Sequence, residues 1–551
     1  MKQFEKLFPY FLFAGILINA NGLINDILEP DGALYATISK HIVLKNDWVN
    51  LIGNGSDWLD KPHFHFWISA ISFKLFGITP FAYKFPAFVF WLAGTFFTYK
   101  LTEEIYDSYT AKIAVIMYTF SLHGILNNFD VRAEPYLTAL SIGAIYFFYK
   151  TTVSNKWYYL ILTAVLAACA VMTKGIFVLL TIGGGFIVYW IISKQWKQFV
   201  NYRWWLLLVL ILLFITPELY CLYVQFDLHP EKVVFEKTNV SGLKFFFWDS
   251  QFGRFFNTGP IRGNGDKTFF LHTTLWAFLP WSILLYVAVF KLIKNRKTET
   301  PGIKWIIYGS AILTFILFSL SGFQLPHYIV ILFPQFAIIS ADYLAKIQTE
   351  RTFKNISVLQ TTLLIMALAA ICLLAFFSKL ANGILVSVIS VPLVVVAMLS
   401  IKKYGTTKIM TLGASFSFVL FLFLHNFFYP KLMEYQAGME AGKWLAQQKD
   451  SLAPVMFRSF SYSFEFYAPG FIKSIGNFND LDNFLKTSSN GAIFTSEESL
   501  PELTSHGYYY NILKDFPYFH VSMLTGKFLN SHTRASQLER MVLVTVQKRR
   551  I

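Results

Sequence analysis

Long apolar runs alternate with short polar segments over most of the chain. Each run holds about 18 or more mainly apolar residues, enough for a helix to cross the hydrocarbon core of a bilayer. A soluble protein can bury one run of this kind, but not a dozen. The pattern predicts an α-helical polytopic membrane protein with about thirteen transmembrane helices. The expected spans are residues 7–25, 81–101, 111–127, 134–150, 157–173, 175–193, 204–223, 269–290, 304–321, 325–343, 357–378, 382–400 and 408–429.

Two longer polar segments interrupt this pattern, at residues 26–80 and 224–268. In the first, Leu34, Ile38, Ile42 and Val43 share one helical face behind Asp31. Such a face predicts an amphipathic helix that lies on the membrane surface. Residues 62–77 are apolar but too short for a span, and they predict a second interfacial or re-entrant helix.

The composition changes after about residue 430. Short apolar stretches at 454–457, 491–494 and 541–546 alternate with polar, helix-compatible segments, as expected for strands of a small α/β domain. About 120 residues are enough for a modest core. We therefore expect a transmembrane domain at 1–430 and a small soluble α/β domain at 431–551.

Composition and charge agree with a membrane protein. Of the 551 residues, 55% are hydrophobic and 14% are charged, whereas about a quarter of an ordinary soluble domain is charged. The net charge of +15 does not indicate nucleic acid as a partner, because Lys and Arg gather on one side of the predicted membrane. They occupy the short loops near residues 100–112, 150–156, 194–203, 291–304, 346–354 and 402–408.

This bias predicts a cytoplasmic N-terminus. Both long loops and the C-terminal segment then lie outside the cytoplasm. Cys169, Cys221 and Cys372 fall in apolar runs, where we expect small packing residues rather than disulfide partners or metal ligands.

Several charged residues fall at the outer ends of predicted spans, where ionisable groups are costly and indicate function. Asp31 is either a helix N-cap or a carboxylate that faces a substrate as base or metal ligand. Asp130, Arg132 and Glu134 lie between the third and fourth spans, on the same face. A solvated turn with a local ion pair explains them, and so does a site that uses Asp130 or Glu134.

Cations accompany these carboxylates. Lys61 precedes Pro62, which favours an extended backbone, and suits phosphate binding. Lys174 has almost no loop around it, and it reaches either a substrate or the lipid headgroups. The planar guanidinium group of Arg254 suits binding of a phosphate through two hydrogen bonds. His327 and Tyr328 begin a later span on the same face, as anchors of that span or as part of the site.

Metal and nucleotide sites find less support. His63 and His65, with Asp60, are candidate metal ligands, although residues two apart point in different directions on a helix. The chain has no Gly-rich phosphate loop, dinucleotide fingerprint or zinc-finger spacing, so a soluble nucleotide-sugar or ATP site is not expected.

The motifs along residues 1–345 follow one order: Asp31-Gly-Ala-Leu-Tyr35, Asn46-Asp47-Trp48, Asp60-Lys-Pro-His-Phe-His-Phe-Trp67, Leu75-Phe-Gly77, Arg132-Ala-Glu134, Met172-Thr-Lys-Gly175, Arg254-Phe255, Phe278-Leu-Pro-Trp281 and Leu325-Pro-His-Tyr328. Together they resemble the membrane glycosyltransferases of the aminoarabinose-transferase and protein O-mannosyltransferase group. These are family 39-like enzymes with the C-type glycosyltransferase (GT-C) fold. Three positions depart from that pattern: Gly32 replaces a second acidic residue, His63 replaces a proline, and Gln324 replaces a frequent lysine.

The resemblance implies transfer of a sugar from a polyprenyl-phosphate donor to a lipid or protein acceptor, at the outer face of a bacterial cytoplasmic membrane. Membrane lipids are further partners. No cofactor is assigned, and a divalent metal is compatible with the carboxylates. The implied catalytic residues are Asp31 and Glu134, and the implied substrate-binding residues are Lys61, Arg132, Lys174, Arg254, His327 and Tyr328.

A lipid flippase or transporter is the alternative from another class. Such proteins tend to have paired repeats and broken helices that place charges near the bilayer midplane. Here the charges fall at the outer ends of spans instead. Gly183-Gly-Gly185 has no counterpart elsewhere in the chain and predicts close helix packing. The sequence does not distinguish among sugars or acceptors.

Overall fold

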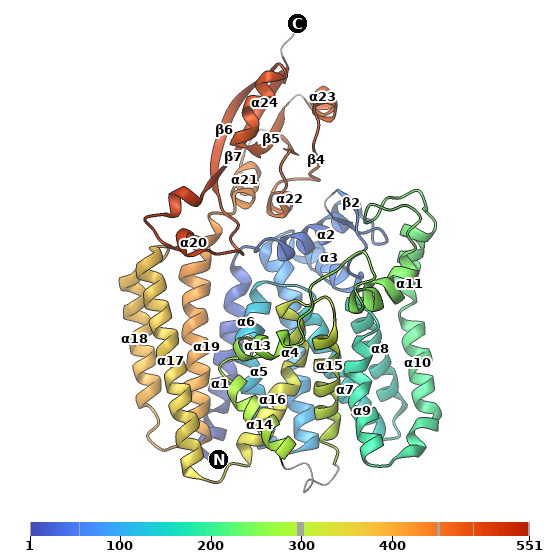
Figure 1. The fold of residues 1–551 in the computed structure, drawn as a ribbon, viewed down its shortest axis with the longest axis vertical. Coiled ribbons are helices and arrows are strands. Elements are labelled where there is room, and N and C mark those ends of the chain that lie inside the picture. The colour runs from blue at the N-terminus through green and yellow to red at the C-terminus, as the bar shows by residue number, and fades with distance from the viewer. Residues whose placement is uncertain (1, 54, 295–301, 449–451, 489, 549–551) are drawn as a thin grey trace.

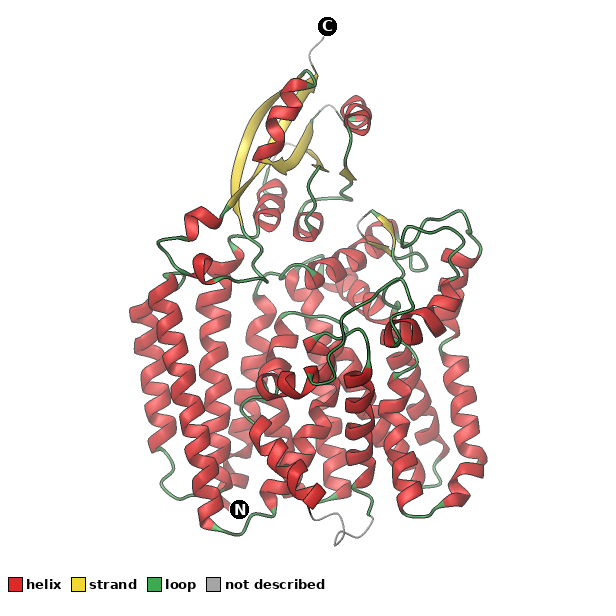
Figure 2. Ribbon diagram, viewed as in Figure 1, coloured by secondary structure: helices red, strands yellow, loops and turns green. Residues whose placement is uncertain are grey.

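The computed structural model describes residues 2–53, 55–294, 302–448, 452–488 and 490–548. Most of them form helices that run between the two ends of a bundle, and a smaller mixed sheet lies beyond one end (Figures 1 and 2). The longer helices of the bundle are α1 (Lys2–Asn21), α4 (Pro80–Ile105), α5 (Ser108–Thr119), α7 (Glu134–Val153), α8 (Trp157–Lys174), α9 (Val178–Ile192), α10 (Tyr202–Phe214), α14 (Ser282–Lys294), α15 (Trp305–Leu320), α16 (Phe333–Ala345), α17 (Glu350–Ser378), α18 (Gly383–Leu399) and α19 (Thr406–Phe423).

The length and composition of these helices suit a bilayer. Among the described residues, five helices are each long and apolar enough to cross a membrane, and a sixth span results if the bent pair Tyr202–Phe214 and Thr216–Asp227 counts as one. Shorter apolar helices such as α9 and α15 accompany them. The protein is a multi-pass membrane protein, and the number of thirteen spans stays a prediction.

Helices α9 and α15 approach closely because glycines line their contact. A Cβ atom on Gly309 would lie 2.8 Å from the Cβ of Val188, and one on Gly185 would collide with the carbonyl oxygen of Ile306. Small residues allow two helix backbones to approach in this way. The close packing predicted for the glycine triplet is confirmed at Gly184 and Gly185, while Gly183 faces open space.

Several expected spans are divided into shorter helices, and residues 204–223 are divided at the bend between α10 and α11 (Thr216–Leu222). Residues 111–127 belong to α5 and α6 (Leu122–Phe129), and residues 269–290 to α13 (Phe269–Ala277) and α14. The prediction of continuous helices was wrong here. Between α13 and α14, Pro280 has no amide hydrogen and disfavours helix at the residue before it. The amide of Leu122 donates to the carbonyl of Leu279 at 2.8 Å, so the break after α5 and the break after α13 stabilise each other.

Two helices of the first long loop lie at the end of the bundle opposite the N-terminus: α2 (Asp31–Lys45) and α3 (Phe64–Phe76) (Figure 1). The predicted short helix at 62–77 is confirmed. The helix behind Asp31 is also confirmed, but its place on an open membrane surface was wrong, because it is buried from Gly32 to Ile42. Its polar side is covered by the C-terminal part of the chain. There the ammonium group of Lys40 donates to the carbonyls of Glu465, Phe466 and Ala468 at 2.7, 3.0 and 2.7 Å.

The C-terminal residues form a five-stranded sheet with the strand order β4-β3-β5-β7-β6. Strand β3 is parallel to β4 and β5, whereas β7 is antiparallel to β5 and β6. The three apolar stretches predicted as strands lie in β3, β5 and β7, while β6 was not predicted. The strands are β3 (Ala453–Phe457), β4 (Ser474–Ile475), β5 (Gly491–Ser496), β6 (Tyr508–Tyr518) and β7 (Glu539–Lys548).

Both faces of this sheet are covered by helices. Along β3, Val455 and Phe457 pack on one face with Leu481, and Met456 packs on the other with Phe464. This alternation follows from the two-residue repeat of a strand. One face carries α21 (Ala437–Ala446) and α22 (Tyr462–Tyr467), the other α23 (Phe478–Thr487) and α24 (Leu500–Ser505). Because α22 also contacts α2, the sheet rests on the helix that begins with Asp31.

Candidate active site

Asp31 begins α2 and does not act as its N-cap, which is Pro30. Its carboxylate instead lies 2.8 Å from the guanidinium of Arg132. Arg132 also binds Asp130 at 2.9 Å, and its third polar neighbour is the Nδ1 atom of His327 at 3.0 Å. Arg132 therefore brings together the first long loop, the segment between α6 and α7, and η5 (Pro326–Leu332).

A second group of charges continues from His327. Its Nε2 atom lies 3.8 Å from Glu134, and the same carboxylate lies 2.5 Å from the ammonium group of Lys174. Lys174 in turn lies 3.6 Å from the ring centre of Tyr328. Glu134 is the first residue of α7 and Lys174 the last of α8. The helix dipoles favour a negative charge at the first position and a positive charge at the second.

Lys61 and Arg254 form a third group through Asp60. The ammonium group of Lys61 lies 2.7 Å from one carboxylate oxygen of Asp60, and Arg254 binds the other oxygen. Arg254 follows the π-helical segment η4 (Phe245–Gly253) of the second long loop. An aspartate thus joins cations that are far apart in the chain.

The electrostatics of the first long loop follow from burial and from these pairs. Burial raises the pKa of Asp31 above its ordinary value, although the neighbouring Arg132 opposes this effect. Burial would also raise the pKa of Asp60, but Lys61 and Arg254 lower it to about 2. Burial lowers the pKa of Lys61. Of these two carboxyls, Asp31 therefore takes up a proton more readily.

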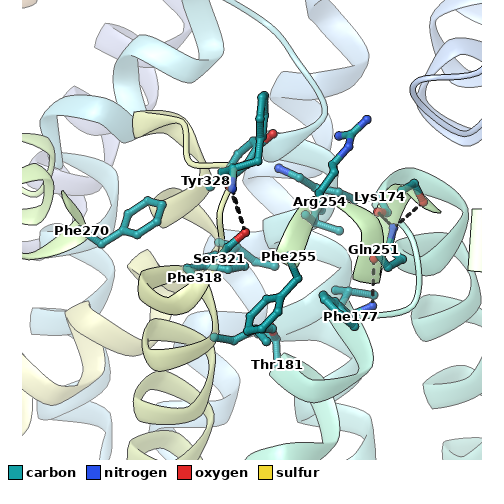
Figure 3. A pocket seen from close by; sticks show the side chains of 16 residues that line it. Lys174, Phe177, Thr181, Gln251, Arg254, Phe255, Phe270, Phe318, Ser321 and Tyr328 are labelled. Carbon is teal, nitrogen blue, oxygen red and sulfur yellow. Dashed lines mark hydrogen bonds between the residues drawn. The ribbon is translucent and has the colours of Figure 1, made fainter. Parts of the chain in front are cut away.

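A cavity with mainly apolar walls begins at Lys174 and Arg254. Figure 3 shows these two side chains together with Gln251, and Phe270 and Phe318 farther along the wall. A second cavity, which Asp60 and Lys61 line, shares Lys174, Ser250, Gln251 and Arg254 with the first. The other apolar residues of the first cavity are Leu137, Phe177, Val178, Phe255, Leu317, Phe323, Tyr328 and Ile331.

Three cations, Lys61, Lys174 and Arg254, gather where the two cavities join. Two carboxylates, Asp60 and Glu134, pair with them, whereas Glu218 of the second cavity pairs with His63. The three cations thus outnumber the carboxylates that bind them, which favours an anion at this junction. A phosphate with a long apolar tail fits both features: cations for its head and apolar walls for its tail.

The structure does not support the candidate metal site on the first loop. The ring nitrogens of His63 lie 3.0 Å from Glu218 and 2.9 Å from the carbonyl of Val49, so both are engaged. Asp60 is held by its two cations. Within the described ranges, no group of three or more His, Cys, Asp or Glu side chains is arranged to hold a metal ion.

Two polar residues near the site were missed in the sequence. Gln251 donates to the carbonyl of Lys174 at 3.2 Å and lines both cavities, but nothing in its surroundings in the chain indicates this. Glu218 accepts a hydrogen bond from the amide of His63 at 3.0 Å. A carboxylate inside the apolar run 204–223 was a usable signal, because such residues need a partner.

Comparison with known proteins shows which fold this chain has. The family model of the dolichyl-phosphate-mannose-protein mannosyltransferases matches residues 60–221. The crystal structure of ArnT from Cupriavidus metallidurans bound to undecaprenyl phosphate superposes with a TM-score of 0.73 over 97% of both chains, at 16% identity. The chain has the GT-C fold. The fold class predicted from the sequence is thus confirmed.

Sequence relatives point to the same group. The undecaprenyl phosphate-alpha-4-amino-4-deoxy-L-arabinose arabinosyl transferase of Edwardsiella ictaluri is 24% identical over 330 residues, which are 58% of this chain and 56% of that protein. The match thus spans little more than half of that relative. An uncharacterized protein of Aquifex aeolicus is also 24% identical, over 81% of this chain and 83% of its own length. The predicted resemblance of this GT-C protein to the aminoarabinose transferases is confirmed.

Proposed function

We propose that this protein transfers a sugar from a polyprenyl-phosphate donor to an acceptor at the outer face of a bacterial cytoplasmic membrane. The observation that carries the proposal is the apolar cavity that begins at Lys174 and Arg254. A prenyl chain suits its walls, and the phosphate suits the cations at its mouth. The names of its relatives, one of them solved with undecaprenyl phosphate, support the same donor class.

The orientation follows from the charge bias of the short loops. Helix α2, which begins with Asp31, lies at the end of the bundle that carries the C-terminal sheet, and the N-terminus lies at the other end (Figure 1). With a cytoplasmic N-terminus, as the loops predict, the site faces the periplasm or the outside. The residues after about 430 then form a soluble domain on that side.

The leaving group of such a donor determines what catalysis requires. When the bond between the sugar C1 and the phosphate oxygen breaks, the electron pair stays on the phosphate. A phosphate monoester is a stable anion and needs no proton from a general acid. Cations that stabilise the developing charge are the main requirement. Lys61, Lys174 and Arg254 supply them in this proposal, and Glu134 holds Lys174 in place.

The acceptor determines whether a base is required. As a hydroxyl oxygen of the acceptor bonds to C1, its proton must leave, and Asp31 is placed to take it. A phosphate acceptor carries no such proton, and Asp31 then orients it. Arg132 positions Asp31 in both cases, and His327 supports Arg132.

Mass spectrometry of lipid A, polyprenyl lipids and secreted proteins tests the proposal in cells with and without the gene. We expect one glycan to lose a mass of pentose or hexose size when the gene is absent, and this mass identifies the acceptor. Unaltered glycans together with lost lipid translocation would contradict the proposal and favour a flippase.

Replacement of Lys61 by Ala is expected to weaken use of the donor. The variant lacks one of the three cations around the phosphate, so the KM for the polyprenyl-phosphate sugar should rise by roughly tenfold, the effect of about 1.4 kcal/mol of lost binding. Steady-state kinetics with purified protein measure this change. Lys45→Ala, on the outer end of α2, is the matched control. An unchanged donor KM in Lys61→Ala would contradict the phosphate role.

The pH profile of transfer to a hydroxyl acceptor reports on Asp31. A base acts only when ionised, so kcat/KM should fall as the pH drops through the raised pKa of Asp31, above the ordinary aspartate value of about 3.9. Arg132 lowers this pKa, so Arg132→Gln should move the acidic limb to higher pH. Arg262→Gln, on the second long loop, should leave it in place. An acidic limb that does not move in Arg132→Gln would contradict the pairing.

A further inference from the structure

A separate cavity of about 160 Å³ lies between the segment just before Asp31 and the C-terminal residues. Its walls come from Glu29 and Pro30 on one side, and from residues 460–462 and 518–522 on the other. It shares no lining residue with the two cavities around Lys174. A cavity needs only about 10–15 Å³ of such space to hold one water, so this one has room for several waters or for a group as large as a sugar ring.

The chemistry of this cavity suits an uncharged, hydroxyl-rich group. Aromatic rings and hydroxyl groups dominate the lining, and neither Lys nor Arg is among the ten residues. The carboxylate of Glu29 in the wall accepts hydrogen bonds from the hydroxyl of Ser461 and the amide of Ser463 at 2.7 and 2.6 Å. Within the described part of the chain, the hydroxyls of Tyr462 and Tyr518 have no hydrogen-bond partner. Such hydroxyls both donate and accept, and tyrosine pairs an apolar ring with a polar tip.

The cavity adjoins the proposed base. Pro30, in its wall, directly precedes Asp31, whose side chain is 35% exposed. Tyr462 lies over α2, where its carbonyl accepts a hydrogen bond from Thr37 at 3.3 Å. Burial raises the pKa of Tyr462 to about 12, with a smaller contribution from the carboxylates of Glu465, Asp31 and Glu29. A group bound here thus lies on the side of Asp31 that is formed by the C-terminal residues.

The far wall of the cavity lies close to the membrane. The segment after Val521 exposes Met523 and Leu524, and it leads into α25 (Gly526–Leu529), which contacts α17. The amide of Ser531 donates to the carbonyl of Phe377, in the last turn of α17. A molecule in this cavity is therefore within reach of the outer end of a membrane-spanning helix.

We propose that this cavity binds a neutral sugar of a lipid-anchored acceptor and presents it to Asp31. The inference rests on the proposed transfer reaction and extends it, because it assigns the acceptor to the glycolipids. It also gives the C-terminal residues a direct part in acceptor choice. The donor cations lie in other cavities, so binding of donor and acceptor can be measured separately.

Native mass spectrometry of the full chain, released from nanodiscs, tests this assignment. The discs contain monoglucosyldiacylglycerol, phosphatidylglycerol or undecaprenyl phosphate. Wild-type protein should retain the glucolipid in preference to phosphatidylglycerol. Ser522→Trp fills the cavity from an exposed position and should lower glucolipid retention by roughly tenfold, while leaving undecaprenyl phosphate bound. Ser505→Trp, an exposed serine of α24, is the matched control.

A second, more conservative variant tests the assignment even if Ser522→Trp does not fold. Tyr462→Phe keeps the ring and removes only the hydroxyl, so it should weaken glucolipid retention with no change in undecaprenyl phosphate. Equal retention of glucolipid and phosphatidylglycerol, or glucolipid binding that Ser522→Trp leaves unchanged, would overturn the acceptor assignment alone. A wild-type protein that does not retain undecaprenyl phosphate would contradict the proposed function itself.

Discussion

Replacement of Asp31 by Asn is expected to reduce transfer to a hydroxyl acceptor by about 10²- to 10⁴-fold, the usual contribution of a general base. The amide has nearly the shape of the carboxylate but cannot take up the acceptor proton. Arg132 keeps its bond to Asp130 in this variant, so the surrounding structure should persist. The measurement is the transfer rate of purified protein, together with the amount of protein in the membrane.

Asp47→Asn is the matched control for this experiment. Asp47 lies in the same long loop, and its Oδ1 atom accepts from the amides of Val49 and Asn50 at 3.0 Å each. An asparagine oxygen can accept both bonds, so activity should stay near wild type. If Asp31→Asn transfers sugar to a hydroxyl acceptor at the wild-type rate, Asp31 is not the base.

Replacement of Lys174 by Met should have a comparable effect on kcat through a different cause. The variant loses the cation that faces the donor phosphate, and it leaves the buried Glu134 without its partner at 2.5 Å. Removal of one electrostatic contact to a developing charge costs about 10²- to 10³-fold in kcat. Single-turnover kinetics with a polyprenyl-phosphate sugar measure the chemical step separately from product release.

Two further variants make the Lys174 result specific. Lys174→Arg keeps the charge and should recover part of the rate, although its planar group does not reproduce the contact with Glu134. Lys379→Met replaces an exposed lysine at the end of α17 and should be neutral. A wild-type single-turnover rate in Lys174→Met would exclude this lysine from the phosphate site.

The sequence predicted those features that depend on local patterns. Pro135 and the apolar run after it marked Glu134 as the start of a helix, and α7 begins there. The two helices of the first long loop were likewise visible from their apolar positions. Charges at the outer ends of spans indicated where a site lies, because such charges need partners.

Features that depend on distant contacts were not predictable. Asp60 and Arg254 are 194 residues apart, and no local pattern indicates that they pair. The sequence also left open whether Asp130 or Glu134 is the second acidic residue of the site. In the structure, Asp130 binds Arg132, and Glu134 binds the cation at the cavity mouth. This geometry favours Glu134 next to the donor.

The buried side of α2 shows the same limit. Lys40 and His41 are polar residues of the helix that was predicted on the membrane surface, yet both are buried against residues near Glu465, more than 400 positions later. The residues that cover Lys40 and His41 belong to the C-terminal part of the chain, and only the folded structure brings them together. For this reason the sequence could not indicate that the C-terminal residues contribute to the region around Asp31.

The most direct test of the account is an experimental structure of the full chain with undecaprenyl phosphate bound. We predict the phosphate within hydrogen-bonding distance of Lys174 and Arg254, with Lys61 beside it, and the prenyl chain along Phe270 and Phe318 in the apolar cavity. A phosphate bound elsewhere, with this cavity filled by side chains or by another lipid, would contradict the account.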